Sequence, residues 1–377
     1  MDFALTEQQE MLRKMARDFL SRECPSSLVR QMVEDEKGYS PELWEEMAQL
    51  GWMELILPQE YSGSEGNFLD LCVLLEEMGR VCLPSPFFST IVLGALLIID
   101  AGSEEQKREL LPKVASGQML LTLALTEPSA RWDAKGVALK AIPDGDNYIL
   151  NGTKLFVPDA NVSDFIVVVA RTQEGMKGEE GITLFLLNTK DHSINITPLK
   201  TISGDKQCSV VFNHVKINRK NVLGEVDKGW QIIDKVLDKA TAAKCCEMVG
   251  GAQRVLEMAV DYAKQRVQFG RPIGSFQAIQ YYCANMATDV DGSRFIAYQA
   301  VWRVSEGLPC AKEVAWAKAW VSEAYRRVTA LGHQIFGAIG FCEDHDMPLY
   351  SKRAKASELF LGDSFFHQDK IAQSLDI

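Results

Sequence analysis

One carboxylate stands out because of the residues that surround it. Glu247 lies in the stretch AAKCCEMVGGAQ, residues 242–253, among alanines, cysteines, glycines and a methionine. The helical pattern around it runs unbroken from Gly229 to about Arg266, which is roughly 55 Å of helix at 1.5 Å per residue. At ~100° per residue, Glu247 lies within about 40° of small or apolar residues. They are Ile233, Val236, Ala240, Ala243 and Gly251. Removal from water makes a carboxylate a stronger base, so this position is a candidate proton acceptor.

A simpler interpretation of Glu247 is also open. Lys244 and Arg254 stand three residues before it and seven after it, on the same side of the helix. An ordinary helical glutamate pairs with such a neighbour or points to a subunit contact. The residues alone are consistent with both interpretations, a proton acceptor and a paired or interface glutamate.

A second candidate site follows the long helix. The stretch QRVQFGRPIGSFQ, residues 265–277, combines Arg266, Gln268 and Phe269 with a turn that contains two glycines. An arginine near a helix end, next to glycines that expose the backbone, suits a pyrophosphate. The alternative is that Arg266 caps the carbonyls of its own helix.

The hydrophobic pattern predicts which elements position these residues. It is helical from Thr6 to about Gly117, with Ser40 as a helix N-cap and Ser103 and Gln106 spaced as a capping box. From about Leu121 to Val222 short β-rich runs follow, with turn-formers at PDGDN and at the NG of residues 151–152. Helices return after this segment and continue to the C-terminus.

We therefore expect an α+β fold of three domains. Residues 1–120 form an N-terminal helical domain, residues 121–225 a central antiparallel β domain, and residues 226–377 a C-terminal four-helix-bundle domain. The longest apolar run, TIVLGALLII at residues 90–99, is too short to span a bilayer and suits a buried helix.

Composition excludes several classes of protein. The chain of 377 residues has a formal net charge of −11 and no clustered run of Lys and Arg, which argues against a nucleic-acid surface. Its nine cysteines include no C-x-x-C pair, so we expect reduced, mostly buried thiols and no metal site. The acidic start MDFALTEQQEML is unlike a signal peptide, and we expect a cytoplasmic protein.

Five motifs in order resemble the acyl-CoA dehydrogenase family over essentially the whole chain. They are LTEPSA from Leu125, NGTKLFV from Asn151, RVQFGRPIGSFQAIQ from Arg266, QIFGAIGF from Gln334 and RAKASELFLGD from Arg353. The resemblance implies a tetramer-forming flavoprotein that holds FAD between the β domain and the C-terminal helices. It also implies a CoA-thioester substrate and an electron-transferring flavoprotein as the partner that takes the electrons.

The resemblance further implies which residues contact FAD. Leu125 and Thr126 match positions at the pyrimidine edge of the isoalloxazine, and Phe156 matches an aromatic residue that lies against the flavin. Other positions match contacts to the pyrophosphate and adenosine of the FAD of a neighbouring subunit, namely Arg266, Gln268, Phe269, Gln334, Gly337 and Gly340. Gln277 matches one more FAD contact.

The reaction of this family is α,β-dehydrogenation of a CoA thioester, which needs a carboxylate base for the α-proton and hydrogen-bond donors for the thioester oxygen. Leu361 stands where the usual base would be, although its backbone N–H can still donate to the thioester oxygen. The other familiar base position corresponds to Ala240. Glu247 is therefore the preferred base, with Asp363 as a weaker rival and Glu127 as a structural residue. A branch acting on steroid side chains and other bulky or dicarboxylic thioesters, the pimeloyl-CoA type included, uses a glutamate in this part of the helix.

Other departures from the family pattern leave alternatives open. Arg131 and Trp132 stand where CoA contacts are expected, Pro158 replaces a threonine near flavin N5, and Thr241 replaces an arginine. The chain then resembles one half of an α2β2 heterotetramer, although a homotetramer fits as well. A catalytically silent partner subunit and an oxygen-using flavoenzyme of the same fold are the competing interpretations.

Overall fold

The computed structural model describes residues 4–173 and 178–375. It contains two compact units, each built from separate stretches of the chain. The first consists of Met1–Gln31, Asn67–Leu83 and Thr241–Ile377, and the second of Met32–Gly66 and Pro84–Ala240. Because these units are defined by contacts and each combines separate stretches of the chain, the boundaries of the three predicted domains stay a prediction.

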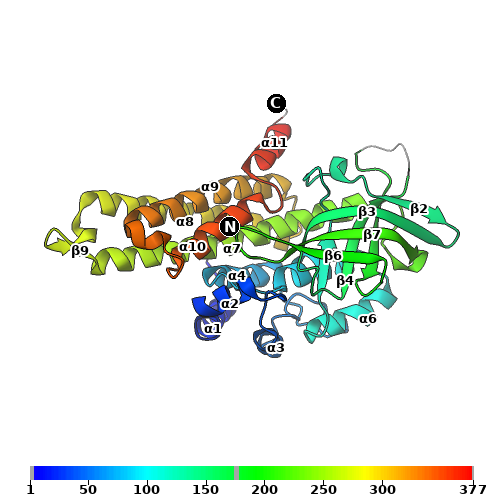
Figure 1. Ribbon diagram of the computed structural model, residues 1–377, viewed down its shortest axis with the longest axis horizontal. Coiled ribbons are helices and arrows are strands. Elements are labelled where there is room, and N and C mark those ends of the chain that lie inside the picture. Colours follow the sequence, from blue (N-terminus) through cyan, green and yellow to red (C-terminus); the bar gives the residue numbers. More distant parts are fainter. Residues whose placement is uncertain (1–3, 174–177, 376–377) are drawn as a thin grey trace. The chain divides into compact units, whose positions relative to one another are not determined.

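An eight-stranded sheet is the centre of the second unit (Figure 1). Its strands are β1 (Leu121–Ala124), β2 (Lys140–Asp144), β3 (Asn147–Pro158), β4 (Phe165–Arg171), β5 (Ile182–Asn188), β6 (Ile194–Leu199), β7 (Gln207–Asn218) and β8 (Val222–Leu223). The order across the sheet is β6-β7-β3-β2-β4-β5-β8, and β1 pairs with β4. The predicted antiparallel pairing holds for most neighbours, but β1 runs parallel to β4, and β2 meets β4 in a parallel contact.

Of the two turns predicted in this unit, one is confirmed and the other is not. PDGDN is the tight turn between β2 and β3, in which Gly145 adopts φ +59°. The prediction of a turn at residues 151–152 is wrong, because both lie inside β3. Gly152 instead marks a register shift against β7 and has φ +150°, so its freedom serves a bulge in the strand.

Helices of the second unit begin where the capping residues predict. Ser40 caps α3 (Pro41–Gln49), and Ser103 and Gln106 form the capping box of α6 (Glu104–Ala115). The apolar run at residues 90–99 is helical and mostly buried, with a π-helical segment η2 (Phe88–Ala95) that continues into α5 (Leu96–Ala101). α2 (Ser26–Glu34) and α7 (Gly229–Gln265) contribute residues to both units, and α7 agrees closely with the predicted long helix.

The first unit is mainly helical. Beside the C-terminal part of α7 it contains α1 (Glu7–Glu23), α4 (Phe68–Arg80), α8 (Gln277–Ser305), α9 (Ala311–Phe336), α10 (Met347–Leu359) and α11 (Ser364–Ser374). α9 packs along α8, α10 and α11, as Figure 1 shows for these yellow to red helices. Two short strands, β9 (Val267–Gln268) and β10 (Arg271–Pro272), form a hairpin after α7.

Two glycines allow α4 and α7 to touch through their backbones. A Cβ atom on Gly79 would lie 1.9 Å from the carbonyl oxygen of Glu247, and one on Gly250 would lie 1.8 Å from that of Glu76. Real Cβ atoms never approach so closely, so any larger residue would force the helices apart. The packing of α4 therefore explains Gly250 inside a long helix.

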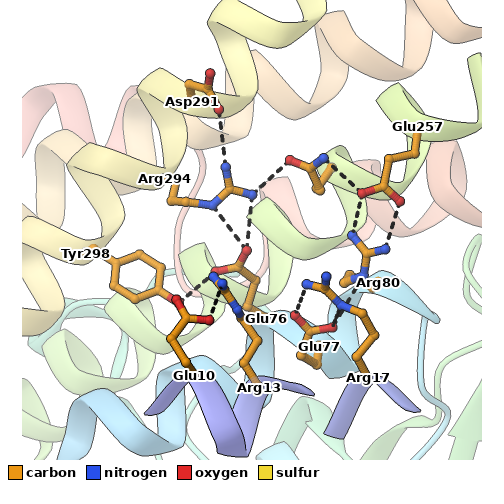
Figure 2. Close-up of polar contacts among 11 residues, drawn as sticks. Glu10, Arg13, Arg17, Glu76, Glu77, Arg80, Glu257, Asp291, Arg294 and Tyr298 are labelled. Atoms are coloured by element: carbon orange, nitrogen blue, oxygen red, sulfur yellow. Dashed lines mark hydrogen bonds and ion pairs between the residues drawn. The ribbon is translucent and has the colours of Figure 1, made fainter. Parts of the chain in front are cut away.

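Buried carboxylates of α4 connect this helix to α1 and α8 (Figure 2). Glu77 forms a two-pronged ion pair with Arg17 of α1, at 2.6 and 2.9 Å. Glu76 accepts hydrogen bonds from Arg294 and from the Tyr298 hydroxyl of α8, the latter at 2.7 Å. Burial, and then the Glu76 charge, raise the pKa of Tyr298 well above its ordinary value. This network has a structural role, because each buried charge has its partner.

All nine cysteines lie outside disulfides, and six of them are buried. Within residues 4–173 and 178–375 no helix is both long and apolar enough to cross a membrane. No group of three or more His, Cys, Asp or Glu side chains in those ranges could hold a metal ion.

Candidate functional site

A strained turn between α10 and α11 presents a free backbone donor. α10 ends at Leu359, and Asp363 caps α11 by accepting a hydrogen bond from the Phe366 N–H at 2.9 Å. Between them Leu361 adopts φ +63°, a left-handed conformation that is uncommon for a leucine, and only 3% of it is exposed. Among the described residues no hydrogen bond from the Leu361 N–H is found. A buried N–H without a partner is rare and marks a place where a ligand oxygen can accept.

Two buried side chains fix the carbonyls of this turn. The Lys318 ammonium donates to the carbonyl of Gly362 at 2.9 Å, and the His367 ring Nε2 lies 2.9 Å from the carbonyl of Leu361. Burial lowers the pKa of Lys318 to about 8. Burial, and then the charge of Lys318, lower the pKa of His367 to about 3, so its ring is neutral and Nε2 carries the proton for Leu361. The sequence did not single out either residue.

Glu247 is paired in the structure. Its carboxylate accepts a hydrogen bond from the Lys244 ammonium at 2.5 Å, and 15% of its side chain is exposed. The Lys244 ammonium also lies 5.4 Å from the centre of the Phe360 ring, next to Leu361. Glu247 and the strained turn thus belong to one neighbourhood of the first unit, linked by Lys244 and Phe360.

The small residues near Glu247 are packed closely against neighbouring parts of the protein. A Cβ atom on Gly251 would lie 2.2 Å from the hydroxyl of Tyr325, and Gly250 meets the backbone of α4. Ala240 and Ala243 are completely buried. The small residues serve close helix packing, and the pairing with Lys244 that the sequence left open is the one observed. Arg254 pairs with Glu257 instead.

Leu125, Thr126 and Phe156 meet at a bulge in the second unit. The pairing of β3 with β7 is interrupted between Lys154 and Val157, and Phe156 adopts φ +55° with 42% of its surface exposed. The Thr126 hydroxyl donates to the Leu155 carbonyl at 2.8 Å, and the Leu155 N–H donates back to the Thr126 carbonyl at 2.9 Å. These reciprocal bonds hold the backbone just before Phe156 against the 125–126 segment.

This segment has the donors that a flavin edge requires. Leu125 and Thr126 are buried, and in the described part of the chain no hydrogen bond from their backbone N–H groups is found. The pyrimidine edge of a flavin carries carbonyl and ring-nitrogen acceptors, which such donors satisfy. The residues present therefore fit the isoalloxazine.

A buried ion pair supports the same segment. Lys154 donates to the Leu125 carbonyl at 2.9 Å and to the Glu127 carboxylate at 2.6 Å. The N–H groups of Ala138 and Leu139 also donate to Glu127. Burial lowers the pKa of Lys154 to about 8. Glu127 thus has the structural role expected from the sequence, while Lys154 was overlooked although a lysine inside the strand run TKLFV was a signal.

Arg266, Gln268 and Phe269 line a cavity of about 350 Å³ in the first unit. Aromatic side chains form much of its wall, among them Tyr262 and Phe276. Phe269, 93% exposed, sits at the tip of the β9–β10 hairpin with φ +53°. An exposed aromatic surface beside an arginine suits a planar base and a phosphate.

The other predicted cofactor residues lie on neighbouring elements. Gln277 begins α8 and donates to the Tyr281 hydroxyl at 2.5 Å. Gln334 is exposed in the last turn of α9, next to two residues that line the cavity. Gly337 ends that helix with φ +64°, and Gly340 is buried against the side chain of Phe336. The structure thus gathers the predicted adenosine-side residues around one end of the first unit.

Three family models together cover almost the whole chain. They are the acyl-CoA dehydrogenase N-terminal domain at residues 6–118, the middle domain at residues 122–215 and the C-terminal domain at residues 227–375. The chain belongs to the acyl-CoA dehydrogenase family. It is accordingly a flavin-dependent oxidoreductase with FAD as its cofactor.

Particular relatives resemble the chain along its full length. Acryloyl-CoA reductase (NADH) of Anaerotignum propionicum is 32% identical over 100% of this chain and 96% of its own. The caffeyl-CoA reductase-Etf complex subunit CarC of Acetobacterium woodii is 31% identical over 98% of each chain. The structure of butyryl-CoA dehydrogenase from Megasphaera elsdenii is 31% identical, with a TM-score of 0.93 and full coverage of both chains.

Proposed function

We propose that this protein oxidises a CoA thioester between its α and β carbons, with Glu247 as the base. The observation that carries the proposal is the buried Leu361 N–H at φ +63°, without a partner among the described residues, beside the Lys244–Glu247 pair. A donor and a carboxylate in one neighbourhood are what proton removal next to a thioester carbonyl requires.

Leu361 has the task of stabilising negative charge. Removal of the α-proton shifts electron density onto the thioester oxygen, and the Leu361 N–H donates a hydrogen bond to that oxygen. The left-handed backbone turns this N–H out of the helical hydrogen-bond pattern, so it is available without breaking another bond. Mutagenesis of comparable oxyanion donors in other enzymes changes turnover by about 10²–10³-fold.

Glu247 accepts the α-proton in this proposal. Its carboxylate keeps lone pairs beyond the one that accepts from Lys244, so it can contact substrate while the ammonium holds its direction. Lys244 also stabilises the position of the side chain relative to Phe360. Asp363 is less suited to this task, because its carboxylate caps α11.

FAD, when bound, would supply the acceptor for the β-hydrogen, proposed to leave as a hydride to flavin N5. Leu125 and Thr126 would hold the pyrimidine edge, and Phe156 would lie against the ring. Arg266, Gln268 and Phe269, with Gln277, Gln334, Gly337 and Gly340 nearby, would hold pyrophosphate and adenosine. We propose that these adenosine-side contacts reach the FAD of a neighbouring subunit in a tetramer, formed either by identical chains or with a related subunit.

The proposed partner for reoxidation is an electron-transferring flavoprotein. This is supported by the name of the Acetobacterium relative, which describes a reductase-Etf complex. The relatives are named for acryloyl-CoA, caffeyl-CoA and butyryl-CoA. These thioesters differ in the size of the acyl group and share a carbon–carbon bond next to the thioester carbonyl. The position of the proposed base also suggests a preference for bulky or dicarboxylic acyl groups. Turnover with a panel of CoA thioesters tests this preference.

Glu247→Gln tests the proposal, with Asp261→Asn on the exposed side of the same helix as the matched control. FAD content and turnover are measured with a panel of short, branched, aryl and dicarboxylic CoA thioesters and an artificial electron acceptor. We expect Glu247→Gln to retain FAD and to lose about 10²–10⁴-fold in turnover, the usual contribution of a general base. Wild-type turnover in an FAD-loaded Glu247→Gln variant would contradict the assignment of the base.

A further inference from the structure

A buried ammonium in the middle of α9 reaches across to the strained turn. Lys318 has no exposed surface, and its Nζ donates to the carbonyls of Ser357, Glu358 and Gly362 at 2.9 to 3.0 Å. A further contact at 3.3 Å joins it to the Ser322 hydroxyl on its own helix. One side chain thus ties together the last turn of α10 and the residue after Leu361.

The Leu361 N–H lies in the 360–361 peptide, and these bonds hold the chain on both sides of that peptide, at the end of α10 and from the Leu361 carbonyl onward. The last carbonyls of a helix lack partners within the helix, and Lys318 supplies them for Ser357 and Glu358. The Gly362 carbonyl is fixed by Lys318 and the Leu361 carbonyl by His367, so the peptide planes on both sides of Gly362 are held. A leucine at φ +63° persists only where its surroundings impose that conformation.

A buried ammonium group is energetically unfavourable in the core of a helical unit. Removing its charge from water is unfavourable, which is why burial lowers the pKa of Lys318, and an apolar side chain would fill the same space at lower cost. What the apolar side chain lacks is a set of directed donors. The groups that act electrostatically on Lys318 are Cys245 and Lys244 from α7, Glu358 from α10 and Asp363 before α11. Its close, directed bonds, however, go to the last carbonyls of α10 and to the carbonyl of Gly362.

We propose that Lys318 and His367 are positioning residues that hold the 359–363 turn so that the Leu361 N–H faces the substrate oxygen. The proposal rests on the proposed function, in which that N–H binds the thioester. Neither side chain needs to touch substrate. Lys318 acts through Gly362 and the end of α10, and His367 acts through the carbonyl of Leu361.

The test uses FAD-loaded protein and four variants. His367→Leu removes the donor to Leu361, while His367→Gln keeps an N–H donor at similar reach. Lys318→Met removes the ammonium and keeps the length of the side chain. Lys312→Met, which changes another lysine of α9 that lies over the Trp316 ring, is the control.

Two readouts separate positioning from general stability. The first is kcat and KM with the best thioester. The second is the infrared stretch of a ¹³C-labelled thioester carbonyl bound to the protein, whose downshift measures the hydrogen bond to its oxygen. We expect His367→Leu and Lys318→Met to lose about 10–10²-fold in kcat and part of the downshift. His367→Gln should recover both to within about threefold.

Each outcome distinguishes the two proposals. If the FAD-loaded His367→Leu variant keeps the wild-type downshift and kcat, the positioning proposal is wrong, even if Lys318→Met fails to fold. A loss that His367→Gln does not recover also overturns it. If the wild-type protein oxidises no thioester of the panel and shifts no carbonyl stretch, the proposed function itself fails.

Discussion

Acid should destabilise this protein through His367 in a way that a single substitution removes. His367 is 2% exposed, and burial followed by the Lys318 charge lower its pKa from 6.5 to about 3. Between these values the unfolded chain binds a proton at this position and the folded protein does not. Acidification therefore favours the unfolded state, and stability rises again with pH up to about 6.5.

The magnitude follows from the size of this window. One pH unit well inside it corresponds to ~1.4 kcal/mol, and lowering the pH from 7.5 to 4.5 costs the wild type about 2.7 kcal/mol through this one residue. With an unfolding entropy of ~2.1 cal/mol/K per residue, the 377-residue chain should lose about 3 °C in Tm from this source. His367→Gln has no imidazole to protonate and escapes this part of the loss.

The assay is thermal unfolding of FAD-loaded wild type and His367→Gln at equal protein concentration, at half-unit steps from pH 7.5 to 4.5. The quantity of interest is the difference in Tm between the two proteins, because carboxylates contribute equally to both. It should move by about 3 °C in favour of the variant as the pH falls. His192→Gln, at an exposed position, is the control. A difference that does not change with pH would refute the reasoning.

Two further substitutions test the packing of each unit. Gly250→Ala should lower the free energy of unfolding by about 3 kcal/mol in denaturant titration, because its Cβ would lie 1.8 Å from the backbone carbonyl oxygen of Glu76. The matched Gly292→Ala, whose Cβ would find ordinary contacts at 3.7 Å, should be neutral or slightly stabilising, and equal effects at both glycines would contradict the packing argument. Lys154→Met should cost about 3–5 kcal/mol and weaken FAD retention, because Glu127 keeps its buried charge and loses its partner. Denaturant unfolding and the flavin-to-protein absorbance ratio check this, and unchanged values would show that the pair does not support the segment.

Local signals predicted much of the fold. The Ser40 cap, the capping box of Ser103 and Gln106 and the unbroken period of α7 are interactions between residues within a few positions of one another. The parallel pairing of β1 with β4 could not be predicted in this way, because β2 and β3 intervene in the sequence. At residues 151–152 a typical turn pair was overridden by the pairing of β3 with β7 on both sides of it.

The residues that build the strained turn were invisible for a similar reason. Lys318 lies in a helical segment, where a lysine is an ordinary residue and gives no sign of burial. Its carbonyl partners follow 39 to 44 residues later in the sequence. Its burial and the left-handed backbone of Leu361 are properties of the folded chain. The sequence could point to the Leu361 N–H through family resemblance, but not to the side chains that fix its direction.

The small residues around Glu247 connect the packing of the helices to the proposed chemistry. Gly79 lets α4 touch the carbonyl of Glu247 itself, so the rotation of α7 at this point is set by backbone contact. With that rotation fixed, Lys244 lies over the Phe360 ring and holds the Glu247 carboxylate beside the turn. Glycine near Glu247 therefore does not make room for a ligand beside the base. Close packing at the glycine sets the rotation of α7 about its axis. This rotation places Lys244 and Glu247 on the side of the helix that faces the turn with the Leu361 N–H.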